Sequence, residues 1–370
     1  MKLSIPKDPL LKAIRTAESF LFIKNLNKAD LLIDASSDIT RIFATDKETS
    51  VIIKINANII ENGSMVIYGK KFNEILSALP NDDVELTSIS ETVSIKTLNK
   101  NTKAIFNLKI LQKDDYEKMP EQKNDNIFKL KQSIFKEMIS KVISSASNDD
   151  TSYALNGILF NVKRDSLKLV ATDGRRLSLI AENIEGTPEE KNVIVSKKVL
   201  GELEKMLGEE GECQIGLSDN QIFFYFENIY ISSTLIEGDY PDYQQVIPNN
   251  FDLDISFNTA FLTRAVKRIS TLLNENYTRI TFSFNNESVT INSADPDLGD
   301  ATEEIPIDSL SKHLDENFII GFNAFFLMDV LKIITNDTVL FRFNKNTNPA
   351  LIMEKNIDKY LSVIMPMKLT

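Results

Sequence analysis

Apolar and polar positions follow one order three times along the 370 residues of the chain. Apolar side chains at helical spacing predict an amphipathic helix in each of residues 8–23, 133–147 and 258–273. A strand-like run after each helix ends in a similar tripeptide, Ala44-Thr45-Asp46, Ala171-Thr172-Asp173 or Ser293-Ala294-Asp295. Further on, each copy has a β-rich run, at residues 65–71, 193–198 or 318–323. Each of these runs leads into a second predicted helix. The recurrence predicts an internal repeat.

The spacing of landmarks supports the repeat. Asp46 and Asp173 are 127 residues apart, and so are Lys70 and Lys197, while the third copy keeps the order with slightly shorter offsets. We therefore expect three copies of one domain, at residues 1–125, 126–250 and 251–370. Each copy should hold two helices and two small antiparallel sheets, which is an α+β architecture.

Composition narrows the class of protein. The most apolar stretch, residues 318–334, is interrupted by Asn323, Asp329 and Lys332, which favours a buried helix over a membrane span. The first residues contain no long apolar run of the kind found in signal peptides. A single cysteine, Cys213, permits no internal disulfide and fits a reducing compartment. We expect a cytoplasmic protein.

Residues for catalysis are scarce. The one histidine, His313, lies in a polar run and is expected to be exposed, and Cys213 is expected to be a small packed residue. One His and one Cys cannot supply a usual zinc ligand set or a Ser–His or Cys–His nucleophile. The sequence therefore predicts no metal, no cofactor and no enzyme activity, and nearly excludes a metal- or nucleotide-dependent hydrolase.

Cations recur on the predicted helices although the net charge is −11. Arg264, Lys267 and Arg268 stand at i, i+3 and i+4 of one helix and so share a face. The cations of any one helix can be explained as part of an ordinary solvated face. Positive charge that recurs on equivalent helices of an acidic protein instead predicts a basic lining that binds nucleic acid. The expected DNA-facing residues are Lys12, Arg15, Lys24, Lys70, Lys71, Lys136, Lys141, Lys197, Lys198, Arg264, Lys267, Arg268 and Lys332.

Four short motifs carry a resemblance. They are Leu155-Asn156-Gly157, the run from Ala171 to Leu177, Tyr240-Pro241-Asp242-Tyr243, and the terminal Met365-Pro366-Met367-Lys368-Leu369. Together they resemble the bacterial DNA sliding clamp family, the β subunit of DNA polymerase III, over the whole chain. The resemblance implies a head-to-tail homodimer of six domains, a ring whose twelve helices face the duplex DNA that it encircles. It implies a processivity factor that tethers the polymerase to DNA.

The resemblance also implies a partner-binding pocket between the second and third copies. It would receive a short extended peptide with hydrophobic anchors from the replicative polymerase α subunit, the clamp loader or repair proteins. By matching motifs, the pocket comprises Leu155, Thr172, Gly174, Arg175, Arg176, Leu177, Pro241, Val246, Val363, Met365, Pro366 and Met367. Gln244 and Gln245 stand where relatives often carry basic residues.

The implied dimer contact joins the third copy of one chain to the first copy of its partner. Leu272 and Leu273 would meet Phe106 and Leu108. Lys71 and Lys103 could pair at the rim with Asp300, Glu303 and Glu304. A clamp-fold scaffold that binds peptides without encircling DNA is the alternative, and the net charge of −11 favours it.

Overall fold

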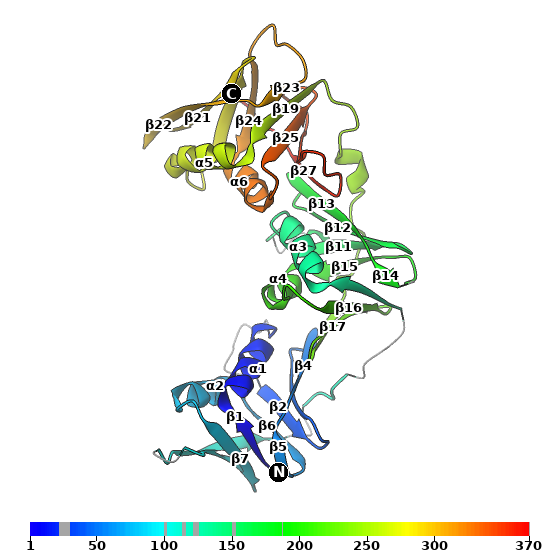
Figure 1. Cartoon of the computed structure of the whole chain (residues 1–370), viewed down its shortest axis with the longest axis vertical. Helices are drawn as coiled ribbons and strands as arrows, with labels where there is room; N and C mark the ends of the chain where they lie inside the picture. Colours follow the sequence, from blue (N-terminus) through cyan, green and yellow to red (C-terminus); the bar gives the residue numbers. More distant parts are fainter. Residues whose placement is uncertain are drawn as a thin grey trace. The chain divides into compact units, whose positions relative to one another are not determined.

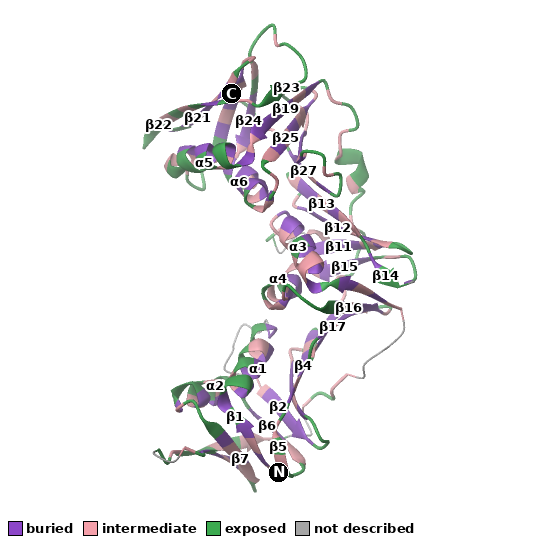
Figure 2. Cartoon of the chain, viewed as in Figure 1, coloured by how far each residue is buried: buried purple, intermediate pink, exposed green. Residues whose placement is uncertain are grey.

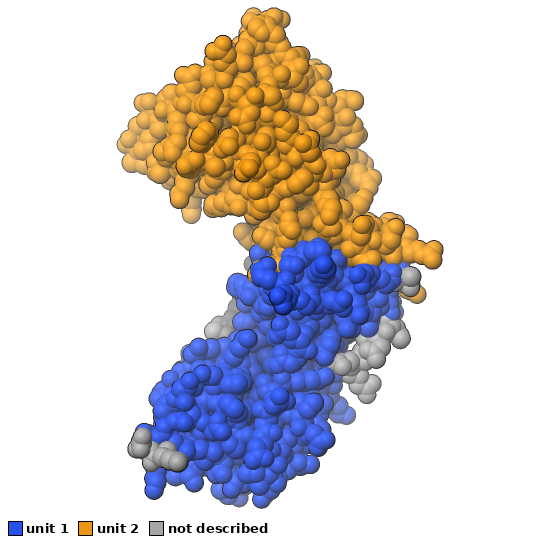
Figure 3. Space-filling model, in the orientation of Figure 1, with its two compact units in different colours: residues 1–135, 185–188, 198–235 blue, residues 136–184, 189–197, 236–370 orange. Residues whose placement is uncertain are grey.

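The structure, a computed structural model, describes residues 1–21, 30–99, 102–112, 116–120, 126–149, 153–186 and 188–369 (Figure 1). They fall into two compact units (Figure 3). Unit 1 comprises residues 1–135, 185–188 and 198–235, and unit 2 comprises residues 136–184, 189–197 and 236–370. The second copy therefore contributes residues to both units.

The first copy lies within unit 1, and its elements follow the predicted order. A strand leads into the first helix, further strands follow, and β6 runs directly into the second helix. The elements are β1 Lys2–Pro6, α1 Lys7–Ser19, β2 Asp30–Ala35, β3 Thr40–Thr45, β4 Thr49–Ile55, β5 Asn58–Glu61, β6 Gly63–Tyr68, α2 Gly69–Ala78, β7 Asp83–Ile89, β8 Thr92–Thr97 and β9 Ile105–Leu111.

The second copy repeats this order and adds two short 3₁₀ helices. Its elements are β10 Ile127–Lys131, α3 Gln132–Ile143, η2 Tyr153–Asn156, β11 Gly157–Val162, β12 Ser166–Thr172, β13 Arg176–Asn183, β14 Glu185–Gly186, β15 Lys191–Ser196, α4 Lys197–Met206, β16 Glu212–Leu217, β17 Gln221–Phe226, β18 Ile229–Thr234 and η3 Tyr243–Val246.

The third copy lies within unit 2. Its elements are β19 Leu253–Asn258, α5 Thr259–Ile269, η4 Ser270–Leu272, β20 Arg279–Phe284, β21 Ser288–Asp295, β22 Gly299–Pro306, β23 Ser309–Leu310, β24 Phe318–Asn323, α6 Ala324–Ile333, β25 Thr338–Phe343, β26 Ala350–Glu354 and β27 Tyr360–Ile364. Asn258 and Asn323 cap its two α-helices, since each side-chain oxygen accepts a backbone N–H of the first turn. The stretch 318–334 is thus a strand followed by a helix, which confirms the β-rich run predicted at residues 318–323 and corrects the interpretation of the whole stretch as one buried helix.

The repeated tripeptides form the same turn in each copy. The Oδ1 atoms of Asp46, Asp173 and Asp295 each accept hydrogen bonds from the backbone N–H groups two and three residues further on. This is the local bond by which Asp favours a turn. In the first two copies the residue after the Asp has a left-handed backbone, with φ of 81° at Lys47 and 83° at Gly174. The repeat therefore extends to backbone geometry.

The sheets continue from one copy into the next. In unit 1, β4 of the first copy pairs antiparallel with β18 of the second, within a 14-stranded sheet. In unit 2, β13 of the second copy pairs antiparallel with β27 of the third, within a nine-stranded sheet. A four-stranded sheet, β22-β21-β20-β24, completes unit 2. Antiparallel sheets with helices on them make the predicted α+β fold, although adjoining copies share sheets.

Buried residues gather on the faces of helices and sheets that are turned toward each other (Figure 2), and most of them are apolar. α1 buries Leu10, Ile14 and Ala17 and exposes Lys12 and Arg15, as its amphipathic pattern predicts. The core of the third copy is rich in phenylalanine rings, such as Phe257, Phe284 and Phe343, whose neighbours lie in edge-to-face or tilted contact. Among the described residues, no helix has the length and apolar run that crossing a bilayer takes. Cys213 is buried and His313 is exposed, as predicted.

Candidate partner-binding surface and basic helix faces

The residues predicted to bind partners gather around the pairing of β13 with β27, all within unit 2. Leu177 lies opposite Val363 across the two strands, and both belong to one apolar cluster with Leu159, Val170 and Leu351. We call the surface over this cluster the junction surface. It is defined by Leu155, Thr172, Gly174, Arg175, Arg176, Leu177, Pro241, Val246, Val363, Met365, Pro366 and Met367.

The turn between β12 and β13 forms one side of the junction surface. Thr172 Oγ1 accepts a hydrogen bond from Gly174 N at 3.1 Å and donates one to Arg176 O at 2.6 Å. Asp173 Oδ1 accepts from Arg175 N at 2.9 Å. Gly174 supplies the left-handed backbone, and no heavy atom outside its chain neighbours lies within 4 Å of the position of its missing Cβ. The turn is fixed by local bonds and presents Gly174 and Arg175 to solvent.

Hydrogen bonds of a half-buried tyrosine, Tyr240, join the loop after β18 to the same turn. Tyr240 Oη accepts a hydrogen bond from Thr172 N at 3.0 Å and donates one to Val170 O at 3.3 Å. Burial raises the pKa of the Tyr240 hydroxyl, so it stays protonated and can donate. This loop carries Pro241 and the exposed Val246 to the junction surface.

The terminal segment after β27 forms the other side. Met365 N donates to Arg175 O at 2.9 Å, and Met367 N donates to Gly321 O at 2.8 Å. The Met367 carbonyl oxygen lies 3.0 Å from where a Cβ on Gly321 would be, so any other residue at this position would push the terminal segment away by a few tenths of an ångström. Met365 is 43% exposed and offers a flexible, polarizable side chain to a ligand.

Two predicted residues of this surface are core residues in the free chain. Leu177 is 1% exposed and Val363 is 2% exposed. Accessible apolar groups come instead from Val246 and Met365. A hollow of about 380 Å³ lies beside the surface and is lined by Leu159, Asn161, Asn192, Ile194, Tyr240, Pro241 and Tyr243, among others. Among the residues predicted to bind partners, only Pro241 lines this hollow. The Tyr-Pro-Asp-Tyr motif was the only sequence feature that pointed to the hollow.

The first junction, where β4 pairs with β18, has the same construction with different chemistry. Tyr116 Oη donates to Phe43 O at 3.3 Å, and Phe43 precedes Val170 by 127 residues. Ser50 lies opposite Ser232 there, at the positions that Leu177 and Val363 occupy in the second junction. An apolar cluster that includes Phe43, Ile52 and Tyr230 lies at the first junction too, so the two junctions differ at the serine pair that stands in place of Leu177 and Val363.

Most of the predicted DNA-facing cations lie on exposed helix positions. Lys12, Lys70, Lys71, Lys198, Arg264, Lys267 and Lys332 are exposed, Lys136 is half-buried, and Lys24 lies outside the described residues. Arg15 is exposed and donates to Ser77 Oγ on α2 at 3.0 Å, so the two helices of the first copy present their cations together. Lys197 is half-buried, donates to Ala146 O and Asn148 Oδ1, and has a pKa lowered by burial and then by the charge of Arg176.

The prediction that Lys141 faces DNA was wrong. Its side chain is 5% exposed and pairs with the Glu354 carboxylate at 3.2 Å, with Glu354 itself 2% exposed. The Lys141 ammonium also lies 5.1 Å from the centre of the Tyr360 ring. A buried cation with a buried acid for a partner is not available to DNA phosphates. Lys141 is instead a contact between the second and third copies.

The predicted dimer residues lie at two strand edges. β9 pairs with β8 along residues 105–109 and with β6 only at Ile110 and Leu111, so within the described residues one edge of 105–109 has no strand partner. Phe106 on this strand is 39% exposed. β22 is the outermost strand of the four-stranded sheet, and η4, which contains Leu272, packs against it.

The acidic rim of β22 is already engaged within the chain. Arg268 Nε donates to Glu303 Oε2 at 3.0 Å, and this bond lowers the pKa of the Glu303 carboxyl. Glu304 accepts from Ser288 Oγ. Lys71 pairs with Glu74 at 2.6 Å. These bonds compete with the rim ion pairs that were expected between chains. They also make Arg268 less available to DNA than Arg264 or Lys267.

Comparisons with known proteins agree with this architecture. Models of the DNA polymerase III β subunit match in chain order: the N-terminal domain at residues 1–120, the central domain at 129–242 and the C-terminal domain at 244–368. The β sliding clamp of Staphylococcus epidermidis is 30% identical over 346 residues, which cover 91% of this chain and 90% of that protein.

Solved structures give the same result. The DNA polymerase sliding clamp of Bacillus subtilis has a TM-score of 0.93 at 26% identity, and both chains are covered completely. The DNA polymerase III β subunit of Pseudomonas aeruginosa has a TM-score of 0.92 at 27% identity, again with both chains covered completely. With all three domain models matched in order and a curated relative covered almost end to end, the chain belongs to the DNA polymerase III β subunit family, the β sliding clamps.

Proposed function

We propose that the protein is the DNA sliding clamp of its organism, a processivity factor that closes as a head-to-tail dimer around duplex DNA. The observation that carries the proposal is the recurrence of exposed cations on equivalent helices of a chain whose net charge is −11. A basic lining attracts phosphates without reading sequence, which suits a ring that must move along DNA. Three copies at residues 1–125, 126–250 and 251–370 per chain would give six domains in the ring.

The two strand edges support closure by a contact between unlike surfaces. The free edge of β9 and the outer edge of β22 can pair as strands of one sheet across two chains. Apolar side chains accompany both edges: the exposed Phe106 lies beside one, and the half-buried Leu272 and Leu273 lie beside the other. A head-to-tail contact of this kind closes a ring if the rotation closes.

The junction surface is the proposed docking site for partners. It joins an apolar cluster, exposed Val246 and Met365, and the fixed turn of residues 172–176, which suits a short peptide with hydrophobic anchors. At the first junction the hydroxyl-bearing Ser50 and Ser232 replace the apolar pair Leu177 and Val363, so we infer one docking site per chain. The replicative polymerase α subunit, the clamp loader and repair proteins would compete for it.

We infer that the protein supplies no catalytic chemistry and acts in the cytoplasm, where bacterial DNA is replicated. Its contribution to synthesis is the tether, which keeps a polymerase at the primer end by topology rather than by tight binding to DNA.

Retention on DNA tests the proposal. Labelled protein is loaded by its ATP-driven loader onto nicked circular DNA, and gel filtration follows the bound fraction before and after a single restriction cut. We expect the protein to stay on the circle at moderate salt and to leave the linear product. Equal loss from circular and linear DNA contradicts encirclement and favours a scaffold that binds peptides without DNA.

A further inference from the structure

We propose that Arg176 is a positioning residue, which holds the junction surface in its binding shape through contacts with α6 and with the end of α3. The inference rests on the proposed partner-binding role of that surface. Arg176 then acts without touching a partner itself, and the affinity for partners depends also on side chains that lie outside the junction surface.

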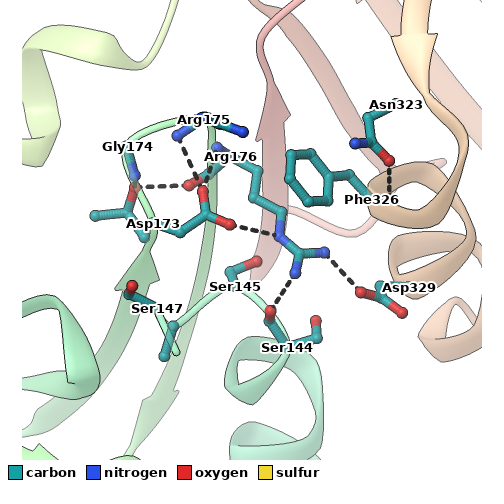
Figure 4. A network of polar contacts seen from close by, with 12 residues as sticks. Ser144, Ser145, Ser147, Asp173, Gly174, Arg175, Arg176, Asn323, Phe326 and Asp329 are labelled. Carbon is teal, nitrogen blue, oxygen red and sulfur yellow. Dashed lines mark hydrogen bonds and ion pairs between the residues drawn. The ribbon is translucent and has the colours of Figure 1, made fainter. Parts of the chain in front are cut away.

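The guanidinium of Arg176 is surrounded by protein groups (Figure 4). Its Nε donates to Asp173 Oδ2 at 3.1 Å, its Nη1 donates to Asp329 Oδ2 at 2.7 Å, and its Nη2 donates to the Ser144 carbonyl oxygen. The Phe326 ring covers one face, with its centre 4.2 Å from the guanidinium carbon. The side chain is 10% exposed.

These contacts tie three parts of unit 2 together. Asp173 belongs to the β12–β13 turn, Ser144 directly follows α3, and Asp329 and Phe326 lie on α6. Figure 4 shows the guanidinium between the turn on one side and α6 on the other. One side chain thus spans the second and third copies beneath the turn.

The β12–β13 turn links Arg176 to the exposed part of the junction surface. The Asp173 carboxylate uses Oδ2 for Arg176 and Oδ1 for the backbone N–H groups of residues 175 and 176. The Arg175 carbonyl oxygen in turn accepts from Met365 N. Loss of Arg176 would leave Asp173 and Asp329 without a cation and free the turn to move relative to Met365. The affinity of the surface would then fall because a ligand would have to order it.

The same contacts argue against Arg176 as a direct ligand contact. Three of its five N–H groups already donate to oxygens, the Phe326 ring covers one face, and the side chain is 10% exposed, so little of the guanidinium is accessible to a partner. The neighbouring Arg175 is exposed and accessible. Thr49 holds the equivalent place at the first junction, opposite Ser233, so that position has no guanidinium to form such a bridge.

The test measures binding of a labelled polymerase α subunit peptide to the full-length dimer by fluorescence anisotropy. Arg176→Ala should weaken binding roughly tenfold or more, since bonds between charged groups are at stake. Asp329→Ala, outside the junction surface, should weaken it in the same direction, and the double variant should be no weaker than Arg176→Ala. Arg176→Lys keeps the charge but loses the forked geometry and should fall between.

A spectroscopic readout separates positioning from a general loss of stability. The ¹³C-methyl NMR signal of Met365 in the free protein should shift in Arg176→Ala and Asp329→Ala. Arg41→Ala is the control: Arg41 pairs with the carboxylate of the buried Asp34, and both residues lie in unit 1, apart from the junction surface. It should lower the melting temperature without moving the Met365 signal.

The outcomes are distinct. If Asp329→Ala binds like the wild type, or if the two losses add in full, Arg176 acts directly and the inference is overturned. If Arg176→Ala does not fold, Asp329→Ala and Arg176→Lys still decide between these outcomes. If the wild type fails to bind the peptide, the proposed role of the junction surface fails first.

Discussion

At the scale of single residues, Lys141 shows the limit of helical spacing. The sequence placed it on the cationic face of a predicted helix, but spacing does not say what covers that face. The partner, Glu354, is 213 residues away and could not be inferred from local pattern. Arg264 and Lys267, chosen by the same reasoning, are exposed as expected. Lys141 differs from these two residues in its long-range contacts, not in its spacing along the helix.

Lys141→Ala should destabilise the protein by about 3–5 kcal/mol, because it leaves the buried Glu354 carboxylate without a cation, with the Thr335 N–H as its remaining donor. Replacing both residues, as Lys141→Met with Glu354→Leu, should cost much less, since no buried charge remains. Urea unfolding measures both variants. Lys198→Ala, at an exposed helix position, is the control and should stay within about 0.5 kcal/mol of the wild type. Equal losses in the single and double variants would contradict the account.

At the scale of elements, the positions of helices could be predicted from the sequence better than contacts between single residues. The six helices found in the described residues begin within a few residues of the predicted positions, because amphipathic spacing and strand-forming runs are local signals. The sharing of sheets between copies was not predicted. The paired residues of β13 and β27 are about 180 positions apart in the sequence. Neither strand has a sequence feature that identifies the other as its partner.

The β12–β13 turn allows a prediction from the repeat. Gly174→Ala should cost about 1 kcal/mol, because its φ of 83° is unfavourable for a residue with a Cβ although space for the Cβ is open. Lys47 adopts the same φ in the first copy, so Lys47→Gly should stabilise the protein by up to about 1 kcal/mol. Thermal unfolding of the two variants gives the comparison. A stabilising Gly174→Ala would show that the turn relaxes in solution.

The terminal segment allows a second prediction. Deletion of residues 365–370 should abolish binding of a polymerase α subunit peptide and leave the dimer intact, because β27 ends at Ile364 and its pairing with β13 remains. A charged residue at Leu177 is a poorer test, since that side chain is 1% exposed and the change would also disturb the core. Fluorescence anisotropy and analytical ultracentrifugation supply the two readouts. Unchanged peptide affinity would move the docking site elsewhere.

At the scale of the whole molecule, the dimer should depend on apolar contact more than on charge. Leu272 and Leu273 replaced together by Ala should weaken the dimer by several kcal/mol, at about 1.5–3 kcal/mol for each leucine buried on association. Neutralising Glu304 should cost about 0–1 kcal/mol, as for an exposed ion pair. Sedimentation equilibrium should find wild-type particles of twice 41.9 kDa. A leucine variant that stays dimeric at low micromolar concentration rules out this contact.

The basic faces determine how the whole ring meets DNA. Arg264 and Lys267 are the cleanest pair to change, because Arg268 is tied to Glu303 beside the strand edge proposed for the dimer. Replacing both with Glu should weaken direct binding to DNA and lower the slope of log affinity against log salt by about 2, close to one unit for each phosphate that the protein no longer neutralises. Loading onto circular DNA should slow, while sedimentation shows an intact dimer. Rings already loaded should still leave only after the DNA is cut, since topology holds them there and the lining serves approach and sliding. Lys312→Glu combined with Lys345→Glu, at exposed loop positions of the third copy, adds the same negative charge and is the control. An equal loss of loading in that control would mean that net charge, rather than the lining, governs the approach to DNA.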